Sequence, residues 1–403
     1  MIIIQCALGF KQFITMIYIL SLFLFYLLYL DNSSSAMVGG TGDRSMYQLV
    51  LVLYVAYIAI ACVYYSIKRK KIYISSVSIP VLLITLVILL KNYLYGNSSQ
   101  YNTLRFLYSV SWFIIIVGID NIFMSMNEKR KNHFMYLMML LFLYTIYNAI
   151  QTFSYISIER DRYVIPTIYL CVMFIPWIIQ LRKVGGNNLF WILIFILLGV
   201  TVLSNKRGAT IAVITSLIVF IFKNETISKG KGSIKIVLKT VTLLIVSFII
   251  FSIISNYLGG ALLVKYSEES FLEGSGRREI YSFAIDSIMN ISNLTDLFFG
   301  FSFDSWELAN FGGHNDWLTF LMINGLSGIL MFFYFYVECF NHSMSSRSKV
   351  SPSYSALFVI MLLQSLYSTS YNPTTHPIIG MMFIGFAEAQ IRKETKYNYY
   401  ERT

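Results

Sequence analysis

Charged side chains are scarce in this sequence. Asp, Glu, Lys and Arg make up 13% of its 403 residues, whereas hydrophobic residues make up 57%. Because soluble domains carry about 25% charged residues, this composition excludes an ordinary soluble protein. Cysteine is also rare, with 4 in the chain, and each cysteine lies in or beside an apolar run. The sequence therefore predicts neither a disulfide framework nor a cysteine-based zinc site.

Long apolar runs recur along the whole chain. They are about 20 residues long, which is enough to cross about 30 Å of hydrocarbon as a helix. We predict an all-α, polytopic membrane protein with about twelve transmembrane helices, forming a single integral membrane domain over residues 1–403. The predicted spans are residues 8–30, 46–66, 74–91, 106–126, 134–153, 163–181, 187–204, 208–222, 236–257, 315–337, 354–371 and 375–391.

The first run could instead be a cleaved signal peptide, since the small residues Ser34-Ser35-Ala36 follow it. Its apolar core is longer than that of a signal peptide, and only Lys11 precedes it as a charged residue. We therefore expect a retained transmembrane span.

The net charge of +11 is divided unevenly between the two sets of loops that alternate along the chain. One set holds 21 of the 31 basic residues and 7 of the 20 acidic ones, and the other set holds 10 and 13. Loops rich in Lys and Arg stay in the cytoplasm. We therefore expect both termini to be cytoplasmic and the loop at 258–314 to be extracytoplasmic. Because the basic residues flank spans and form no single patch, they do not predict nucleic-acid binding.

The loop at 258–314 is the longest interruption of the apolar pattern and contains much of the polar chemistry of the chain. Arg277 and Arg278 open a segment in which apolar residues recur at helical spacing, which predicts a short amphipathic helix. This helix lies on the bilayer or packs against other loops. His314 ends the loop at the start of the next span, and such a histidine is either structural or a general base.

The shortest extracytoplasmic turn, Asn205-Lys206-Arg207-Gly208, contains a pair of cations. Its glycine permits a tight turn. Arg207 stands beside the start of the next predicted helix, where free N–H groups and the helix dipole favour an anion. Alternatively, Arg207 is an interfacial arginine of the kind that is common at span ends.

Two acidic features are open to more than one interpretation. Asp120 lies well inside an apolar run, which makes it a candidate for function, but its nearness to the cytoplasmic end favours a structural or interfacial role. Glu159 and Asp161 could bind a divalent cation. The neighbouring Arg160 and Arg162 already neutralise them, and we therefore expect no metal and no cofactor.

Extracytoplasmic arginines above hydrophobic spans suit one kind of substrate. Arginine binds phosphate and pyrophosphate oxygens through two parallel hydrogen bonds. A lipid with a pyrophosphate head would place its tail among the spans and its head at Arg207 and Arg277. A sugar on that pyrophosphate has an activated anomeric carbon, and His314 could remove the proton of an attacking hydroxyl.

Four short motifs, in this order and on the same predicted face, resemble those of the bacterial O-antigen polymerase and ligase superfamily (Wzy-type and WaaL-type). They lie within about residues 187–340 and are Ser204-Asn205-Lys206-Arg207-Gly208, Gly276-Arg277, His314-Asn315 and Gly325-Leu326-Ser327-Gly328. The resemblance implies a GT-C-like glycosyltransferase of the bacterial cytoplasmic membrane. It implies that Arg207 and Arg277 contact pyrophosphate and that His314 is the base. Arg278 would share or replace the role of Arg277.

The resemblance also implies the partners of the protein. They are an undecaprenyl-pyrophosphate-linked oligosaccharide as donor and acceptor, membrane lipid, and a chain-length regulator protein. A polymerase of O-antigen or capsular repeat units is the leading interpretation, and a ligase with the same donor but another acceptor shares the motifs. A flippase or transporter of the same lipid-linked sugar is a third hypothesis. Transporters, however, place polar residues at mid-membrane, and the span interiors here are nearly free of charge.

Overall fold

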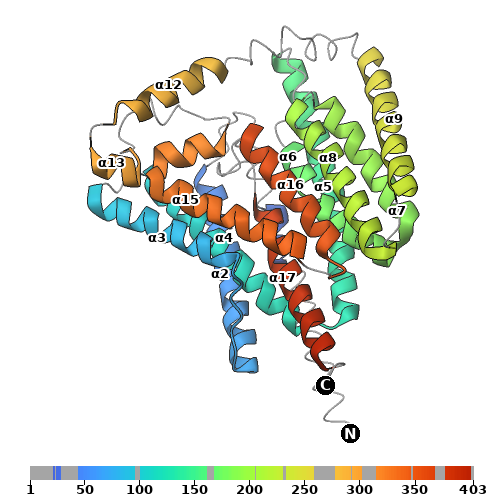
Figure 1. Ribbon diagram of the computed structural model, residues 1–403, viewed down its shortest axis with the longest axis horizontal. Coiled ribbons are helices and arrows are strands. Elements are labelled where there is room, and N and C mark those ends of the chain that lie inside the picture. Colours follow the sequence, from blue (N-terminus) through green and yellow to red (C-terminus); the bar gives the residue numbers. More distant parts are fainter. Residues whose placement is uncertain are drawn as a thin grey trace.

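In the residues that the computed structural model describes, the regular secondary structure is helical (Figure 1). These are residues 21–22, 24–28, 44–95, 100–160, 168–204, 206–229, 233–257, 277–291, 293–301, 315–345, 348–367 and 377–400, and most of the first predicted span lies outside them. The helices before the long loop are α2 (Arg44–Arg69), α3 (Ser78–Tyr95), α4 (Gln100–Ser125), α5 (Glu128–Arg160), α6 (Ile168–Val172), α7 (Ile175–Leu203), α8 (Arg207–Lys229) and α9 (Ser233–Tyr257). The later ones are α12 (Arg277–Met289), α13 (Leu294–Phe299), α15 (Asp316–Ser345), α16 (Ser351–Tyr367) and α17 (Pro377–Tyr400).

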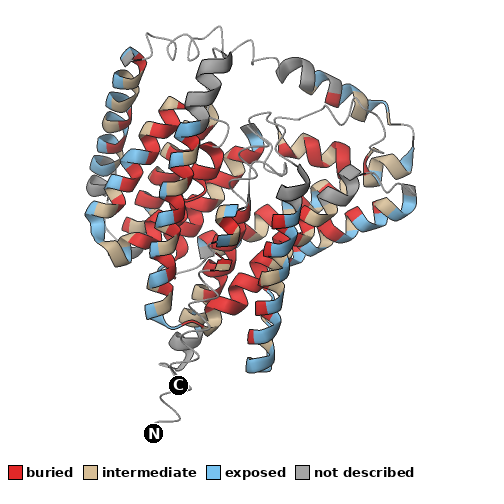
Figure 2. Cartoon of the chain, turned by 180° about the vertical axis from the view of Figure 1, so that it is seen from behind, coloured by how far each residue is buried: buried red, intermediate tan, exposed pale blue. Residues whose placement is uncertain are grey.

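The outer surface of the bundle is apolar. On α9, the side chains of Leu238, Phe248 and Ile253 are 65%, 69% and 64% exposed, while buried residues fill the interior (Figure 2). Lipid tails solvate such a surface, whereas water does not. Seven helices among the described residues are long and apolar enough to cross a membrane, and two more apolar helices, Ser78–Leu94 and Ser351–Leu366, are shorter. The described part of the chain is therefore all-helical and has the helices of a polytopic membrane protein, while the count of twelve and the GT-C-like arrangement stay predictions.

Two predicted spans, 163–181 and 187–204, belong to one helical stretch, Ile168–Leu203, that breaks twice. The first break lies between α6 and α7, just before Pro176 in the first turn of α7. Proline has no N–H with which to continue the hydrogen bonds of the preceding helix. The second falls at Gly186, whose φ of 83° and ψ of 175° are not helical. The glycine lies between the two predicted spans, so the sequence pattern located the change of direction.

Helix α16 lies between α8 and α15 and packs against both. Near its end, Ser365 Oγ accepts a hydrogen bond from Trp317 Nε1 at the start of α15 (2.9 Å). At its start, Ser351 Oγ donates to Ser343 O near the end of α15 (2.7 Å), and the same turn of α16 borders Phe220 in the second half of α8. Helix α16 is thus antiparallel to both neighbours, and α8 and α15 begin at the same end of it.

Contacts among the basic segments gather them at one end of the bundle, here named the basic end. Lys183 Nζ donates to Lys349 O (2.9 Å), and Lys223 Nζ donates to Met344 O (3.0 Å). Further bonds join the remaining segments to the same end. The segments that meet there are Lys68–Lys71, Lys129–Lys131, Arg182–Lys183, Lys223, Lys349 and Arg392–Lys393. The first residues of α8 and α15 lie at the other end, here named the opposite end.

Asp120 and Asn121 are buried at the basic end and hold helices together. Asp120 is 1% exposed, and its Oδ2 lies 3.1 Å from Nη2 of Arg392 on α17. Asn121 Oδ1 accepts from the N–H of Tyr73 (3.0 Å), and its Nδ2 donates to Tyr73 O (2.7 Å). These contacts join α4 to α17 and to the segment before α3. They support the structural interpretation of Asp120, because its charge is paired inside the protein.

A second buried carboxylate at the basic end is paired in a similar way. Glu388 Oε1 lies 2.7 Å from Nδ1 of His342, whose Nε2 lies 2.8 Å from Ser76 Oγ. With its proton on Nδ1, the ring donates to Glu388 and accepts from Ser76. This chain of contacts joins α17, α15 and the segment before α3.

The backbones of α13 and α15 meet at two glycines. Gly300 follows α13 with φ 80°, and Gly325 interrupts α15 with φ 61°. A Cβ on Gly300 would lie 2.3 Å from the backbone carbon of Ile323, and a Cβ on Gly325 would lie 2.5 Å from the backbone carbon of Phe298. Only residues without a side chain permit this approach. The contact fixes part of the long loop against the bundle.

Lys91, in the last turns of α3, donates hydrogen bonds to both sides of this contact. Two carbonyls that precede the bend in α15 accept hydrogen bonds from outside the helix: Met322 O from the N–H of Phe301 (2.8 Å), and Ile323 O from Lys91 Nζ. Lys91 Nζ also donates to Phe301 O (2.7 Å), and the lysine is 2% exposed. A buried carbonyl without a partner is costly, so this lysine stabilises the bend.

We predict that Gly325→Ala will lower the thermal unfolding midpoint of the detergent-solubilised protein by several degrees. The new Cβ would meet backbone atoms and would require a left-handed φ. Gly199→Ala is the matched control, because nothing lies within 4 Å of its Cβ position in α7. It should keep or raise the midpoint, since alanine favours a helix over glycine by about 0.5–1 kcal/mol. Equal midpoints for the two variants would contradict the contact.

Candidate functional site

Helix α8 begins at Arg207, one residue before the predicted span and within the predicted turn. The turn before it is shaped by Ser204, whose Oγ accepts from the N–H of Lys206 (3.2 Å) and donates to Thr201 O (2.6 Å). Lys206 O accepts from the N–H of Ala209 (3.0 Å). Ser204 is fully buried, and Arg207 is half-buried. The serine of this motif is therefore structural, and the arginine stands at the helix start.

Helix α12 begins at Arg277, which confirms the short helix predicted in the long loop. Ala284 is fully buried, whereas Ile285 and Met289 are 51% and 79% exposed. The helix packs against α15, and Figure 1 shows it along the top of the molecule, apart from most of the bundle. Its exposed apolar residues suit a bilayer surface. The side chains of Arg277 and Arg278 lie outside the described residues, so their role stays a prediction.

Asn315 caps the start of α15. Its Oδ1 accepts from the N–H groups of Trp317 (2.9 Å) and Leu318 (3.2 Å), and its backbone oxygen accepts from Thr319 Oγ1 (2.8 Å). An asparagine here satisfies N–H groups that a helix start leaves without partners. Asn315 therefore has a structural role of its own. His314 lies outside the described residues, and its role as a base stays a prediction.

Asp316 is a further candidate functional residue at this helix start, and the motifs did not include it. It follows Asn315 in the first turn of α15 and is fully buried. The helix dipole favours a carboxylate at this position, which offsets part of the cost of its burial. The signal was present in the sequence, because an acid directly after His314-Asn315 opens an apolar span. Asp316 is a second ionisable group close to His314 along the chain.

These elements begin at one face of the bundle. Helices α8 and α15 both start at the same end of α16, so Arg207 and Asn315 lie at the opposite end from the basic segments. Helix α12 packs against α15, and the Gly300–Gly325 contact holds the following segment there. This face therefore has two chemical features. Arg207 at the start of α8 suits the binding of an anion, and Asp316 at the start of α15 is a buried carboxylate.

Metal binding finds no support in the part of the chain that the structure describes. Within it, no group of three or more His, Cys, Asp or Glu residues could hold a metal ion. The side chains of Glu159 and Asp161 lie outside it, so that alternative stays untested. Three of the four cysteines, Cys62, Cys171 and Cys339, are buried free thiols, as expected of cysteines in apolar runs.

No protein-family model matches this sequence, and no curated protein sequence matches it either. Membership of a family is therefore not shown by these comparisons.

We predict that Asn315→Ala will destabilise the protein by about 1 kcal/mol, because two N–H groups at the start of α15 lose their acceptor. Asn315→Asp should retain the stability, since aspartate caps helices as well as asparagine does. The thermal midpoint in detergent measures both. Asn290→Ala, at an exposed asparagine that follows α12, is the control and should change nothing. An equal loss in Asn315→Asp and Asn315→Ala would refute the capping role.

Proposed function

We propose that this protein is a glycosyltransferase that polymerises the oligosaccharide repeat units of a bacterial surface polysaccharide, O antigen or capsule. Its donor and acceptor are undecaprenyl-pyrophosphate-linked units, and a chain-length regulator protein is a further partner. It acts on the extracytoplasmic face of the cytoplasmic membrane, with both termini in the cytoplasm. The resemblance of the four motifs supports the reaction class.

One observation carries the proposal. Helix α8 begins with Arg207, α15 begins directly after His314-Asn315, and α16 packs between them so that both begin at one end. An anion-binding cation and a candidate base are thus expected at a common face, although they come from separate helices. The basic segments occupy the other end, which agrees with an extracytoplasmic position of this face.

In the proposed reaction, Arg207 and Arg277 hold the donor pyrophosphate through paired hydrogen bonds. An acceptor hydroxyl oxygen attacks the anomeric carbon of the donor sugar, and a glycosidic bond forms as the bond from that carbon to the pyrophosphate oxygen breaks. The lipid pyrophosphate leaves with the bonding electrons, and the arginines stabilise its charge. His314 takes the proton of the acceptor hydroxyl. Arg278 shares or replaces the role of Arg277.

The test is a reaction with one substrate. The purified protein in a lipid bilayer receives a single lipid-pyrophosphate-linked repeat unit, and the products are separated by size. A regular ladder supports a polymerase, because the unit then serves as both donor and acceptor. Transfer that requires a different added acceptor would show a ligase, and movement of an unchanged unit between leaflets would show a transporter. Either of these two results overturns the proposal.

We predict that His314→Ala will abolish glycan transfer, because no group then removes the proton from the acceptor hydroxyl. Membrane insertion and the thermal midpoint should be unchanged. His133→Ala, which removes an exposed histidine at the start of α5, is the matched control and should retain activity. Full activity of His314→Ala in the polymerisation assay would exclude the histidine as the base.

We predict that Arg207→Lys will lower the rate of glycan transfer by about tenfold or more. Lysine keeps the charge but loses the two parallel N–H donors, and hydrogen bonds to charged groups contribute about 1.5–3 kcal/mol. Arg130→Lys, at the start of α5, makes the same exchange at the basic end and serves as the control. If Arg207→Lys has the activity of the unchanged protein, paired recognition of pyrophosphate by Arg207 is wrong.

A further inference from the structure

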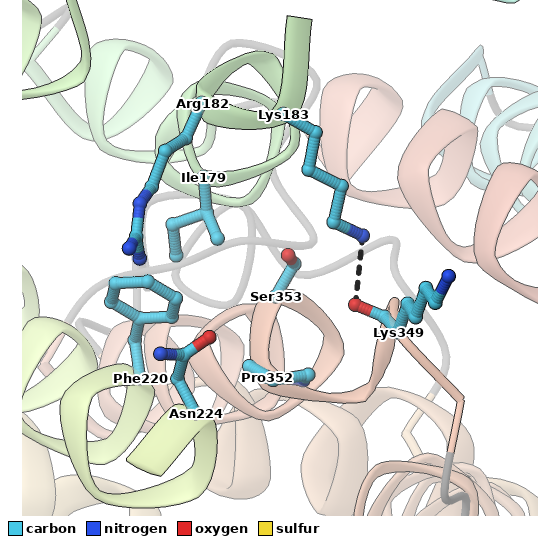
Figure 3. Close-up of a pocket in the computed structure, with 8 residues that line it drawn as sticks. All are labelled: Ile179, Arg182, Lys183, Phe220, Asn224, Lys349, Pro352 and Ser353. Carbon is cyan, nitrogen blue, oxygen red and sulfur yellow. Dashed lines mark hydrogen bonds between the residues drawn. The ribbon is translucent and has the colours of Figure 1, made fainter. Parts of the chain in front are cut away.

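A cavity opens at the basic end between α7, α8 and the start of α16 (Figure 3). Its volume is about 250 Å³. The polar residues that line it are Arg182, Lys183, Asn224, Lys349 and Ser353. Three of these are cations, and none of the described residues that line the cavity is acidic. A cavity with this lining favours an anion.

Arg182 is held in place without the use of its hydrogen-bond donors. Its guanidinium carbon lies 5.9 Å from the ring centroid of Phe190 and 5.9 Å from that of Phe220. These cation–π contacts hold the guanidinium near the two rings without using its N–H donors. Among the residues that the structure describes, the side chain of Arg182 makes no hydrogen bond or ion pair. Its N–H groups can therefore bind two oxygens of one phosphate.

Lys183 approaches the cavity from the other side. Its Nζ donates to Gln180 Oε1 (2.8 Å) and to Lys349 O (2.9 Å), which leaves one of its three N–H donors. Figure 3 shows Arg182 and Lys183 on either side of the cavity, with the amide of Asn224 below them. The ammonium group of Lys349 points away from the cavity in this view, so it adds positive charge but no contact.

The backbone at this end of α16 contributes less than the side chains do. The N–H of Ser353 in its first turn already donates to Val350 O (3.1 Å). Two carboxylates lie close by. Glu394 Oε2 accepts from the backbone N–H of Lys349 (3.1 Å), and Glu128, which also interacts with the charge of Lys183, lies 2.6 Å from Lys131 Nζ. Because Glu128 is paired with Lys131, the three lining cations keep an excess of positive charge.

We infer that this cavity binds a phosphate group, held between the guanidinium of Arg182 and the ammonium of Lys183. A volume of about 250 Å³ is below the range of about 300–1,000 Å³ that is usual for larger small-molecule ligands, so it suits a phosphate with a small attached group. Basic pockets between membrane helices bind the head groups of anionic lipids, and soluble phosphate offers the same chemistry. The site lies at the other end of α8 from Arg207, so it does not depend on the proposed function.

The experiment compares three probes on the purified full-length protein in neutral detergent. Phosphatidylglycerol, phosphatidylcholine or inorganic phosphate is titrated, and the thermal midpoint is measured at constant ionic strength. Arg182→Gln removes the proposed ligand. Lys129→Gln removes one charge from an exposed lysine at the same end, outside the cavity, and is the matched control. Because Arg182 also packs on two rings, Lys183→Gln is a second variant in case Arg182→Gln does not fold.

The expected result is that phosphatidylglycerol, but not phosphatidylcholine, raises the midpoint of the unchanged protein and of Lys129→Gln. The apparent affinity should fall at least about tenfold in Arg182→Gln or Lys183→Gln, because a charge-assisted hydrogen bond is lost. If inorganic phosphate gives an equal shift that depends on Arg182 or Lys183, the site binds the phosphate group itself and a soluble source is sufficient. The same titration curves in both cavity variants and in the control, with either probe, would overturn the inference.

Discussion

The contact between Gly300 and Gly325 is the constraint on which the candidate site depends. A bend in α15 frees two carbonyls, and an adjoining backbone together with the buried Lys91 satisfies them. This is possible because neither glycine has a side chain to separate the two backbones. The bend leaves the first turns of α15, with Asn315 at their start, as a separate short segment at the opposite end. Gly325, the first glycine of the motif that resembles the O-antigen polymerase superfamily, is thus required by backbone packing in this fold.

The two ends of the bundle use their polar residues differently. In a bilayer, polar groups without partners are costly, so buried charges are paired within the protein. Asp120 pairs with Arg392, and Glu388 with His342, and both pairs hold helices together at the basic end. In the motifs at the opposite end, Ser204 and Asn315 serve the backbone. The arginines and the histidine of these motifs stay the candidates for chemistry.

The sequence predicted what is encoded locally. Apolar runs predicted the long helices, a turn signal predicted the start of α8 to within one residue, and helical spacing predicted α12. The position of α16 between α8 and α15 could not be predicted, because it depends on packing between segments far apart in the chain. Lys91 was missed for the same reason, since its acceptors lie more than two hundred residues away. Asp316 could have been found, because its position beside His314-Asn315 is visible in the sequence.

Two cationic sites lie at the two ends of α8, one at Arg207 and one at Arg182. The space around each site determines whether it suits the proposed glycan transfer. The cavity at Arg182 is lined by residues of α7, α8 and α16 and has room for little more than a phosphate with a small attached group. A polymerase binds two lipid-linked oligosaccharides at once, so its site needs an open face with space for both sugars. Arg207 stands at the start of a helix, at the end where α15 also begins. We therefore assign the proposed transfer reaction to the face at Arg207, and a small ligand that carries a phosphate to the cavity at Arg182.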